Sequence, residues 1–464
     1  MTTKQYQKRP TSEEAIKELK NLLGERFSTE VGDLKKHGND KSHLPAFDPD
    51  GVAYPESTEE VAEVMKICKK YKVVVIPYGV GSSLEGHTSA LFGGIHVDTS
   101  HMKKVIRFSK PDMDITVEAG LLKTELEKWL KEKDCFFGVD PGSESTVGGW
   151  CATGASGTMT VKYGTLRDNV LNLTVVLEDG RILKTANRAR KSSSGYDLTH
   201  LFMGSEGTLG IITEITLKVY QIPKAVSAGS CCFPTVRNCT EAVTEIVQSS
   251  LGSLARCEFL NVKAIQAVNK LFETDYTEKP SLFLEFHGNT IEQVESVKDK
   301  LAEIVNNHKA EGFQFTSDEE KRKIMWKCRH SAYYASIKLR PKSKLLVTDV
   351  CVPISNLPNI IVETEEDFVK EGLSCPIVGH VYDGNFHVMC PIYDEEEVII
   401  ERLNSRLVKR AIKYEGTCSG EHGVGYGKMD YALQEHGEVF MDISKQIKKA
   451  FDPENRLNPG KIFN

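Results

Sequence analysis

The sequence predicts a multidomain chain of mixed α and β structure, and three observations support this prediction. Glycine-rich loops occur at residues 77–87, 141–164 and 204–219. Strand-like runs lie beside these loops and alternate with helix-like segments. From residue 226 to about residue 401 the alternation of strands and helices continues without glycine loops. The chain therefore divides into a loop-rich first part and a second part of different character.

Composition narrows the class of protein. The 464 residues correspond to about three domains, and 40% of them are hydrophobic, which is enough for large cores. The formal net charge of −6 gives no electrostatic reason to expect binding to nucleic acid or to an anionic membrane. No apolar run reaches the roughly 20 residues of a membrane-spanning helix. We therefore predict no transmembrane segment and no nucleic-acid partner.

The twelve cysteines form no CxxC pair, so iron–sulfur and zinc-ribbon patterns are absent from the sequence. Cys68, Cys257 and Cys375 stand in apolar surroundings and are predicted to be reduced, buried thiols. The first residues match neither a secretory signal nor a transit peptide.

Helix and strand signals recur through the first part. An amphipathic helix is predicted over 12–26, with Ser12 as its first cap and Glu13 in its first turn. A second helix is predicted from Ser57, as N-cap, through Lys70. Strands are predicted at 73–76, 94–98, 115–119 and 170–177, with a helix at 124–133 and a last strand within 204–219.

The loop at 141–164 is the central feature, because it holds six glycines among small residues. Glycine permits positive φ and lets the backbone approach a ligand closely. A flexible linker is the alternative. Trp150, Tyr163 and the strand that follows at 170–177 argue against a linker. We therefore interpret the loop as a cofactor cradle.

The loop at 77–87 follows a strand, which is the usual arrangement for binding phosphate. It is not a GxGxxG motif, because Leu84 stands at the third glycine position. A nicotinamide Rossmann site is therefore not supported.

In the second part, strands are predicted at 231–233, 255–260 and 282–287, and helices at 240–249 and 291–308. This order is typical of a ferredoxin-like domain. A polar helix containing Trp326 and Arg329 follows, and a long helix at 431–451 precedes the C-terminal tail.

The segment VGHVYDGNFHVM contains Asp383-Gly384, a strong signal for a two-residue type I′ hairpin turn. That turn would place Tyr382 opposite Asn385, and Val381 opposite Phe386. It would also place His380 directly opposite His387, with Cβ atoms about 5 Å apart. Two such imidazoles could share a metal ion. Two stacked histidines without a metal are equally compatible with the pattern.

Further on, GTCSGEHGVGYGK contains the adjacent residues Glu421 and His422. If this segment is extended, the two side chains point to opposite faces. One of them could then complete a His/His/Glu metal site. Lys428 does not mark a P-loop, since Met429 replaces the required Ser or Thr.

Several motifs recur in the order known from one flavoprotein family: PYGVGSSLEG, DPGSESTVGG, ATGASGT, GSEGTLGIIT, GHVYDGNFH, GEHGVG and LNPGK. From residue 45 onward the sequence resembles the vanillyl-alcohol-oxidase-type FAD-binding flavoproteins. Within them it resembles the FAD-linked D-lactate dehydrogenase branch of the D-2-hydroxyacid dehydrogenases. The resemblance implies an α+β fold with a two-subdomain FAD-binding domain, a ferredoxin-like α+β cap that binds substrate, and a C-terminal helical segment. The implied boundaries are 1–45, 46–223, 224–402 and 403–464.

The resemblance also assigns residues. It implies non-covalent FAD, since His87 lies beyond the position used for covalent attachment. The residues expected to contact the flavin cofactor are Pro77, Gly79, Val80, Gly81, Ser82, Ser83, Pro141, Gly142, Thr146, Gly149, Gly154, Ser156, Gly157, Glu206, Ile212 and Asn458. Trp150 stands where relatives often have Asn, and Tyr382 stands where they usually have Gly.

The implied chemistry is metal-assisted oxidation of a D-2-hydroxy acid, D-lactate to pyruvate. Arg329 is expected to bind the substrate carboxylate and His422 to act as general base, and the expected ligands of a zinc or manganese ion are His380, His387 and Glu421. Electrons would pass to an acceptor such as cytochrome c, a quinone or another flavoprotein. The resemblance implies a mitochondrial location, with the cytoplasm as the alternative.

Other functions remain open at this point. D-2-hydroxyglutarate or glycolate oxidation would use the same machinery. Met389, two residues after His387, is apolar and favours a substrate with a small or apolar tail. A flavin-free metallohydrolase or a metal-binding module would explain the His/His/Glu set without the glycine loops.

Overall fold

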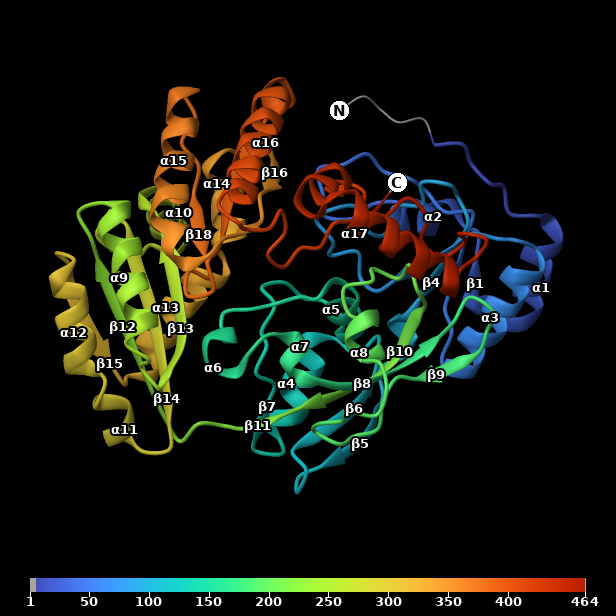
Figure 1. Cartoon of the computed structure of the whole chain (residues 1–464), viewed down its shortest axis with the longest axis horizontal. Helices are drawn as coiled ribbons and strands as arrows, with labels where there is room; N and C mark the ends of the chain where they lie inside the picture. The colour runs from blue at the N-terminus through green and yellow to red at the C-terminus, as the bar shows by residue number, and fades with distance from the viewer. Residues whose placement is uncertain (1–5, 464) are drawn as a thin grey trace. The chain divides into compact units, whose positions relative to one another are not determined.

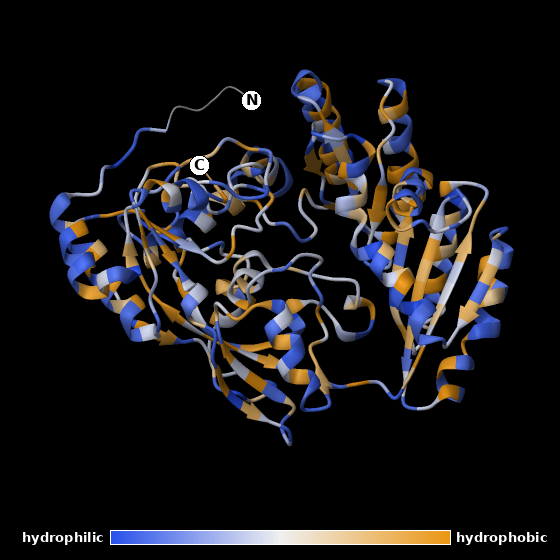
Figure 2. Cartoon of the chain, turned by 180° about the vertical axis from the view of Figure 1, so that it is seen from behind, coloured by the Kyte–Doolittle hydropathy of each residue, from blue (hydrophilic) through white to orange (hydrophobic). Residues whose placement is uncertain are grey.

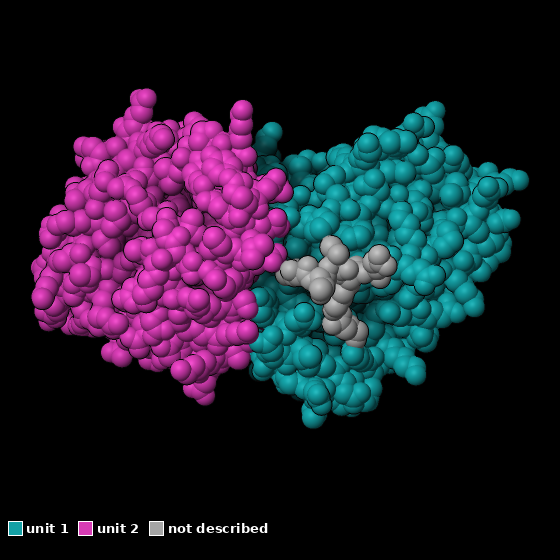
Figure 3. All heavy atoms as spheres, turned by 90° about the horizontal axis from the view of Figure 1, so that it is seen from above, with its two compact units in different colours: residues 1–156, 165–221, 421–464 teal, residues 157–164, 222–420 magenta. Residues whose placement is uncertain are grey.

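The computed structural model describes residues 6–463, which form two compact units (Figure 3). Unit 1 comprises residues 1–156, 165–221 and 421–464, and unit 2 comprises residues 157–164 and 222–420. Figure 1 labels the helices and strands of both units. Each unit has its own sheets and its own hydrophobic core.

Unit 1 contains two main sheets. The first has the order β1-β2-β4-β3, formed by Phe27–Ser28, Gly51–Ala53, Ile95–Asp98 and Val75–Tyr78, and β2, β4 and β3 are parallel. The second is antiparallel with the order β5-β6-β10-β8-β9, formed by Val105–Ser109, Asp114–Glu118, Ile211–Lys218, Val170–Val176 and Ile182–Lys184. Cys135–Phe136 (β7) pairs with Tyr220–Gln221 (β11).

Two helices of unit 1 begin at the capping residues that the sequence predicts. Ser12 caps α1 and Ser57 caps α3, each accepting a hydrogen bond from a backbone N–H in the first turn. The helices are α1 Glu13–Leu23, α2 Val31–His37, α3 Thr58–Lys70, α4 Lys123–Lys131, α5 Val147–Thr153, α7 Leu166–Asn169, α8 Leu198–Phe202 and α17 Met429–Phe451. The predicted helices at 12–26, 57–70, 124–133 and 431–451 are therefore confirmed, although α17 is kinked at Gly437.

The C-terminal tail is tied into the first sheet of unit 1. The N–H of Val75 donates to the carbonyl of Arg456, and the N–H of Asn458 donates to that of Val75 (2.9 and 2.8 Å). Asn458 is thereby held beside β3, the strand that leads into the first glycine loop.

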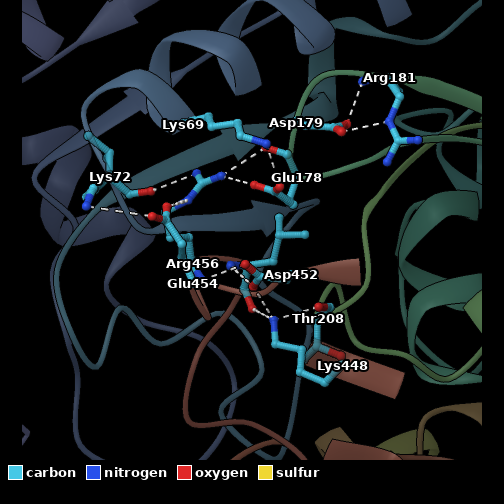
Figure 4. Close-up of polar contacts among 12 residues, drawn as sticks. Lys69, Lys72, Glu178, Asp179, Arg181, Thr208, Lys448, Asp452, Glu454 and Arg456 are labelled. Carbon is cyan, nitrogen blue, oxygen red and sulfur yellow. Dashed lines mark hydrogen bonds and ion pairs between the residues drawn. The ribbon is translucent and has the colours of Figure 1, made fainter. Parts of the chain in front are cut away.

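A buried ionic network fixes this tail (Figure 4). The guanidinium of Arg456, 1% exposed, pairs with the carboxylate of Glu178 at the end of β8. The ammonium of Lys448 pairs with Asp452 and donates to the carbonyls of Thr208 and Leu457, both at 2.7 Å. Because each buried charge has partners, the network joins α17 and the tail to the sheets.

Unit 2 is built on one antiparallel eight-stranded sheet with the order β15-β12-β14-β13-β18-β19-β16, and β17 also pairs with β19. The strands are β12 Ala225–Cys232, β13 Leu254–Leu260, β14 Ser281–Gly288, β15 Glu311–Thr316, β16 Lys344–Val347, β17 Val350–Cys351, β18 Ile377–Gly379 and β19 Asn385–Ile392. Strands β12 to β15 have the spatial order 4-1-3-2. Helices follow the first and third of them, and an additional helix at Val262–Phe272 follows the second. This is the predicted ferredoxin-like arrangement.

The helices of unit 2 cover both faces of its sheet. They are α6 Thr160–Tyr163, α9 Val236–Gln248, α10 Val262–Phe272, α11 Ile291–Glu295, α12 Lys298–Asn307, α13 Glu319–His330, α14 Ala332–Leu339, α15 Leu357–Lys370 and α16 Glu397–Lys413. In Figure 1, α9 and α12 lie on one face. On the other face, residues of α10, α13 and α14 form a core with Ala228, Leu260 and Phe283 of the strands. The single helix predicted over 291–308 is wrong, because two helices, α11 and α12, occupy it.

Hydropathy follows this arrangement. Figure 2 shows that the central strands are largely hydrophobic, while the helices mix hydrophobic and hydrophilic residues. The cysteines have the predicted role: all twelve are free, and Cys68, Cys257 and Cys375 are buried. Among the described residues, no helix has both the length and the apolar character needed to cross a membrane.

Candidate active site

The first glycine loop has the form of an anion-binding nest. Gly79–Ser83 follow β3 directly, and Gly81 has φ +64°. Within residues 6–463, none of the five backbone amides from Gly79 to Ser83 donates a hydrogen bond to another protein group. Successive free amides beside a left-handed residue form a concave donor surface for phosphate oxygens. The loop therefore fits the diphosphate of a dinucleotide cofactor. Val80 within it is 40% exposed.

The second glycine loop lies against the first. Thr146 caps α5 by accepting a hydrogen bond from the N–H of Gly149 (3.2 Å). A Cβ placed on Gly79 would stand 2.5 Å from Oγ1 of Thr146, so this approach requires glycine. Gly154 ends α5 in the left-handed conformation, at φ +70°. Two loops predicted to cradle one cofactor are thus in contact within unit 1.

The other residues predicted to contact the cofactor lie in strands, in the core or next to α5. Pro77 is within β3, and Pro141 accepts a hydrogen bond from the ammonium of Lys123 (2.7 Å). Gly142 has open space around its Cα, since no atom lies within 4 Å of an added Cβ. Ile212 is in β10 and packs in the core of the five-stranded sheet. Ser156 and Gly157 follow α5, and the carbonyl of Gly157 accepts a hydrogen bond from the hydroxyl of Thr160.

Trp150 has a structural role in this loop. Its indole N–H donates to Oγ of Ser145 (2.7 Å), and its ring stacks parallel to that of Phe137. The residue is buried in the core of unit 1. The side chain at this position therefore packs in the core and supports the loop from within unit 1.

Asn458 joins three parts of the cradle. Its side-chain amide donates to the carbonyls of His87 (3.0 Å) and Glu206 (2.7 Å). The tail, the first glycine loop and the third loop therefore meet at one buried residue.

His87 and Glu206 form a buried pair. Nε2 of His87 lies 3.3 Å from Oε1 of Glu206, and Nδ1 contacts the hydroxyl of Ser83. Burial lowers the pKa of His87, but the charge of Glu206 outweighs burial and the net shift is upward. Burial raises the pKa of Glu206, but the imidazolium and two backbone N–H groups outweigh it and the net shift is downward. Both nitrogens of His87 therefore face protein groups.

The hairpin at 377–392 differs from the predicted one. The observed register pairs Val378 with His387, so the two-residue type I′ turn and the three predicted cross-strand pairs are wrong. The loop instead spans residues 381–384 and is closed by hydrogen bonds to the carbonyl of His380. It is longer because Val381 is fully buried and the carbonyl of Gly384 accepts a hydrogen bond from the N–H of Val352.

The two histidines nevertheless come together. Their ring centroids are 5.8 Å apart and their planes are nearly perpendicular. Nδ1 of His387 lies 3.0 Å from the carbonyl of Thr348, and Nδ1 of His380 lies 2.8 Å from Oε1 of Glu258. Since a carbonyl and a carboxylate only accept, both Nδ1 atoms carry a proton, and in the neutral form of each ring Nε2 holds the lone pair. A histidine held in this way is prepared to bind a metal.

Glu421 is the third residue of a group that could hold a metal ion. His380, His387 and Glu421 each offer one ligand atom, and these atoms lie within 4.8 Å of one another. Glu421 follows Gly420, the last residue of unit 2, by one peptide bond. Two imidazoles and one carboxylate are suitable ligands for zinc or manganese. The donor set therefore fits a divalent ion.

The segment 416–428 is irregular, with only Thr417 bridging to Cys351. The extended conformation that would separate Glu421 from His422 is therefore absent. A second group of close ligand atoms consists of Asp349, His387 and His422.

Sequence reasoning missed two acidic residues, Asp349 and Glu258. Asp349 is buried and accepts hydrogen bonds from Asn385 (2.8 Å) and Ser419 (2.8 Å), so it connects the hairpin with the segment before Glu421. Glu258 is 1% exposed within β13. A carboxylate within or between apolar strand segments is the signal that could have identified both, because a buried charge requires partners.

Arg329 is buried on α13 and is paired inside unit 2. Its Nη2 lies 2.6 Å from Oε2 of Glu258. Its Nε has no hydrogen-bond partner among the described residues. Arg329, His380 and His387 thus all belong to the same unit, and Glu258 contacts the first two.

Two protein-family models match the sequence of this chain. Residues 49–186 match the FAD binding domain, and residues 222–462 match the C-terminal domain of FAD linked oxidases. The chain therefore belongs to the FAD-linked oxidase family, as the motifs predicted.

Individual relatives narrow the class of enzyme within this family. The chain is 42% identical to the probable mitochondrial D-lactate dehydrogenase of Danio rerio over 459 residues, 97% of this chain and 92% of the relative. It is 41% identical to the mitochondrial D-lactate dehydrogenase (cytochrome) of Arabidopsis thaliana over 459 residues, 97% of this chain and 80% of the relative. The chain is an FAD-dependent oxidoreductase with D-lactate dehydrogenases as homologues.

A solved structure shows the same fold. That of p-cresol methylhydroxylase with substrate bound superposes with a TM-score of 0.82 at 16% identity and covers 98% of both chains. The predicted vanillyl-alcohol-oxidase-type fold is thereby confirmed.

Proposed function

We propose that this chain oxidises a D-2-hydroxy acid, D-lactate to pyruvate, and uses FAD and a divalent metal ion. The observation that carries the proposal is the His380, His387 and Glu421 group, with the buried Arg329 in the same unit as both histidines. The homology to D-lactate dehydrogenases over nearly the whole chain supports it.

FAD, held non-covalently by the loops of unit 1, would supply the acceptor for the Cα hydride. A divalent ion on His380, His387 and Glu421 would supply positive charge that favours ionisation of the substrate hydroxyl.

The side chains of the protein orient the substrate and remove its hydroxyl proton. Arg329 binds the carboxylate of the substrate, and its guanidinium allows a two-pronged contact that sets orientation as well as position. Its burial strengthens this contact, because water screens it less. His422 removes the hydroxyl proton as general base. The substrate thus loses one proton from oxygen and one hydride from carbon, which gives the keto acid.

Lactate is favoured over a dicarboxylic substrate. Met389 lies on the same strand face as His387 and is 7% exposed within an apolar cluster. An apolar neighbour suits a methyl group better than a second carboxylate, which would be costly to bury without a partner.

The electrons then pass to an external acceptor, for which we propose a cytochrome c-type partner in mitochondria. The names of the relatives in Danio rerio and Arabidopsis thaliana support the location, and the name of the Arabidopsis thaliana relative supports a cytochrome as acceptor.

Rapid mixing of the oxidised protein with single substrates tests the function. We expect D-lactate to bleach the flavin absorbance and L-lactate to leave it unchanged, with D-2-hydroxyglutarate and glycolate slower than D-lactate. Faster reduction by either of these would reassign the substrate. Purified protein without flavin absorbance would instead favour a metallohydrolase or a metal-binding module.

A further inference from the structure

Glu258 is placed to act on two groups of the proposed site at once. It lies on β13, and its carboxylate contacts Arg329 through Oε2 (2.6 Å) and His380 through Oε1 (2.8 Å). All three residues belong to unit 2. The carboxylate is 1% exposed, so neither contact is screened by water.

Strand register explains why this residue reaches both groups. Phe259 pairs with Gly379 in an antiparallel register, so the preceding residue of β13, Glu258, stands opposite His380, where β18 ends. Glu258 also shares a face with Leu260, which packs in the core containing Trp326 of α13. Arg329 is three residues after Trp326, on the same side of that helix. Strand β18 and helix α13 therefore bring His380 and Arg329 to the same carboxylate, that of Glu258.

The neighbouring charges are already paired elsewhere. Arg256, two residues before Glu258 on the same face, lies 3.3 Å from Glu285 of β14. Glu285 also contacts Nε2 of His287 (2.9 Å). This second buried acid has similar surroundings but contacts neither a proposed metal ligand nor Arg329, which makes it a matched control.

We propose that Glu258 is a positioning residue that couples metal binding to substrate binding. The proposal rests on the function proposed above. Through Oε1, Glu258 holds the proton of His380 on Nδ1 and presents Nε2 to the metal. Through Oε2, it partly neutralises Arg329 and occupies the guanidinium that the substrate carboxylate needs.

The two contacts predict effects of opposite sign when the charge of Glu258 is removed. A carboxylate behind a ligating histidine raises the basicity of the ring, and its loss typically lowers metal affinity by about 10-fold to 100-fold. The guanidinium of Arg329, in contrast, is no longer neutralised by the carboxylate of Glu258, which competes with the substrate carboxylate. A monocarboxylate should therefore bind more tightly. A general loss of structure would weaken both interactions together.

The experiment compares wild type with Glu258→Gln and Glu285→Gln, each purified with bound flavin. Binding of Mn²⁺ to the metal-depleted protein is measured by calorimetry, as is binding of pyruvate to the same metal-free protein. In Glu258→Gln we expect Mn²⁺ to bind about 10-fold to 100-fold more weakly and pyruvate to bind more tightly than in wild type. In Glu285→Gln we expect both affinities to stay near those of wild type.

A second variant covers the case in which Glu258→Gln does not fold. In Arg329→Met, Glu258 interacts with His380 alone, so Mn²⁺ should bind at least as tightly as in wild type while pyruvate binding is lost. Unchanged Mn²⁺ affinity in Glu258→Gln, equal losses in Glu258→Gln and Glu285→Gln, or weaker Mn²⁺ binding in Arg329→Met would each overturn the coupling. Absence of Mn²⁺ and Zn²⁺ binding in wild type is a different result, because it removes the metal from the proposed function as well.

Discussion

The carboxylate of Glu206 accepts a hydrogen bond from the backbone N–H of Gly425 at 2.8 Å, although 219 residues separate the two in sequence. Its other oxygen accepts from the N–H of Val424 at 2.6 Å. Glu206 is 5% exposed. One buried acid of the third glycine loop therefore fixes the backbone two residues after His422, which places the proposed general base.

Glu206→Gln should loosen that segment. The amide retains one acceptor oxygen, but its NH₂ group faces a backbone donor, and a charged hydrogen bond is lost. We expect a loss of about 1.5–3 kcal/mol in the free energy of unfolding, measured by denaturant titration. Glu214→Gln, where the carboxylate accepts from the hydroxyl of Thr174 on the sheet, is the control and should lose less. Equal losses would mean that Glu206 has no special role in holding the segment.

Gly81→Ala should empty the flavin site. Gly81 has φ +64°, and an added Cβ would stand 2.4 Å from the hydroxyl of Tyr78. The loop must therefore move, and its amides lose their common direction. We expect purified Gly81→Ala to have much less flavin per protein by absorbance. Gly32→Ala, with open space and no positive φ, should keep its flavin. Full flavin content in both variants would argue against the nest as the phosphate site.

Glu421 and His422 should have separable roles. Glu421→Ala should lose the metal, as measured by elemental analysis, and keep the flavin. His422→Ala should keep metal and flavin, but flavin reduction by D-lactate should slow by about 100-fold to 10,000-fold, the usual contribution of a general base. Wild-type reduction rates in His422→Ala would remove that residue from the mechanism.

The buried Lys461 should make stability depend on pH. Burial lowers the pKa of this lysine to about 7, against about 10.4 in the unfolded chain. Between these values the unfolded chain binds more protons than the folded chain. The free energy of unfolding therefore increases as the pH rises from about 7. The limiting slope is about 1.4 kcal/mol per pH unit. Burial also lowers the pKa of Lys448, to about 8, in the same direction.

Unfolding midpoints of the flavin-free chain measured from about pH 7 to about pH 9 check this prediction. We expect a smaller rise with pH in Lys461→Met than in wild type, with the remaining slope due partly to Lys448. An identical slope in both proteins would show that Lys461 is charged in the folded state.

The ionic network of the tail should be important for stability. Arg456→Ala leaves the buried carboxylate of Glu178 with one cation fewer, and breaking such a pair costs about 3–5 kcal/mol. Arg181→Ala removes an exposed pair with Asp179 and should cost at most about 1 kcal/mol. Both residues appear in Figure 4. Chemical denaturation monitored by tryptophan fluorescence measures the difference, and similar losses would contradict a structural role for the network.

Local signals in the sequence were sufficient for many of the elements. Ser12 and Ser57 cap helices where predicted, because capping depends on residues three or four positions apart. The glycines marked tight backbone geometry, since an added Cβ would clash at Gly79 and Gly81 and glycine readily adopts the positive φ of Gly81. The order of strands and helices in unit 2 indicated its ferredoxin-like core for the same local reasons.

Tertiary structure determined the register of the hairpin and the partners of the buried charges. Asp383-Gly384 predicted a two-residue turn, but burial of Val381 and the contact of Gly384 with Val352 lengthened the loop and shifted the register. The partners of Glu258 could not be derived from sequence either, since Arg329 and His380 are 71 and 122 residues away and are brought to it only by the sheet and α13. Sequence determines which residues favour a turn, a cap or a ligand, because those preferences are local. Which buried charges meet depends on strand register and helix packing, which the whole fold sets.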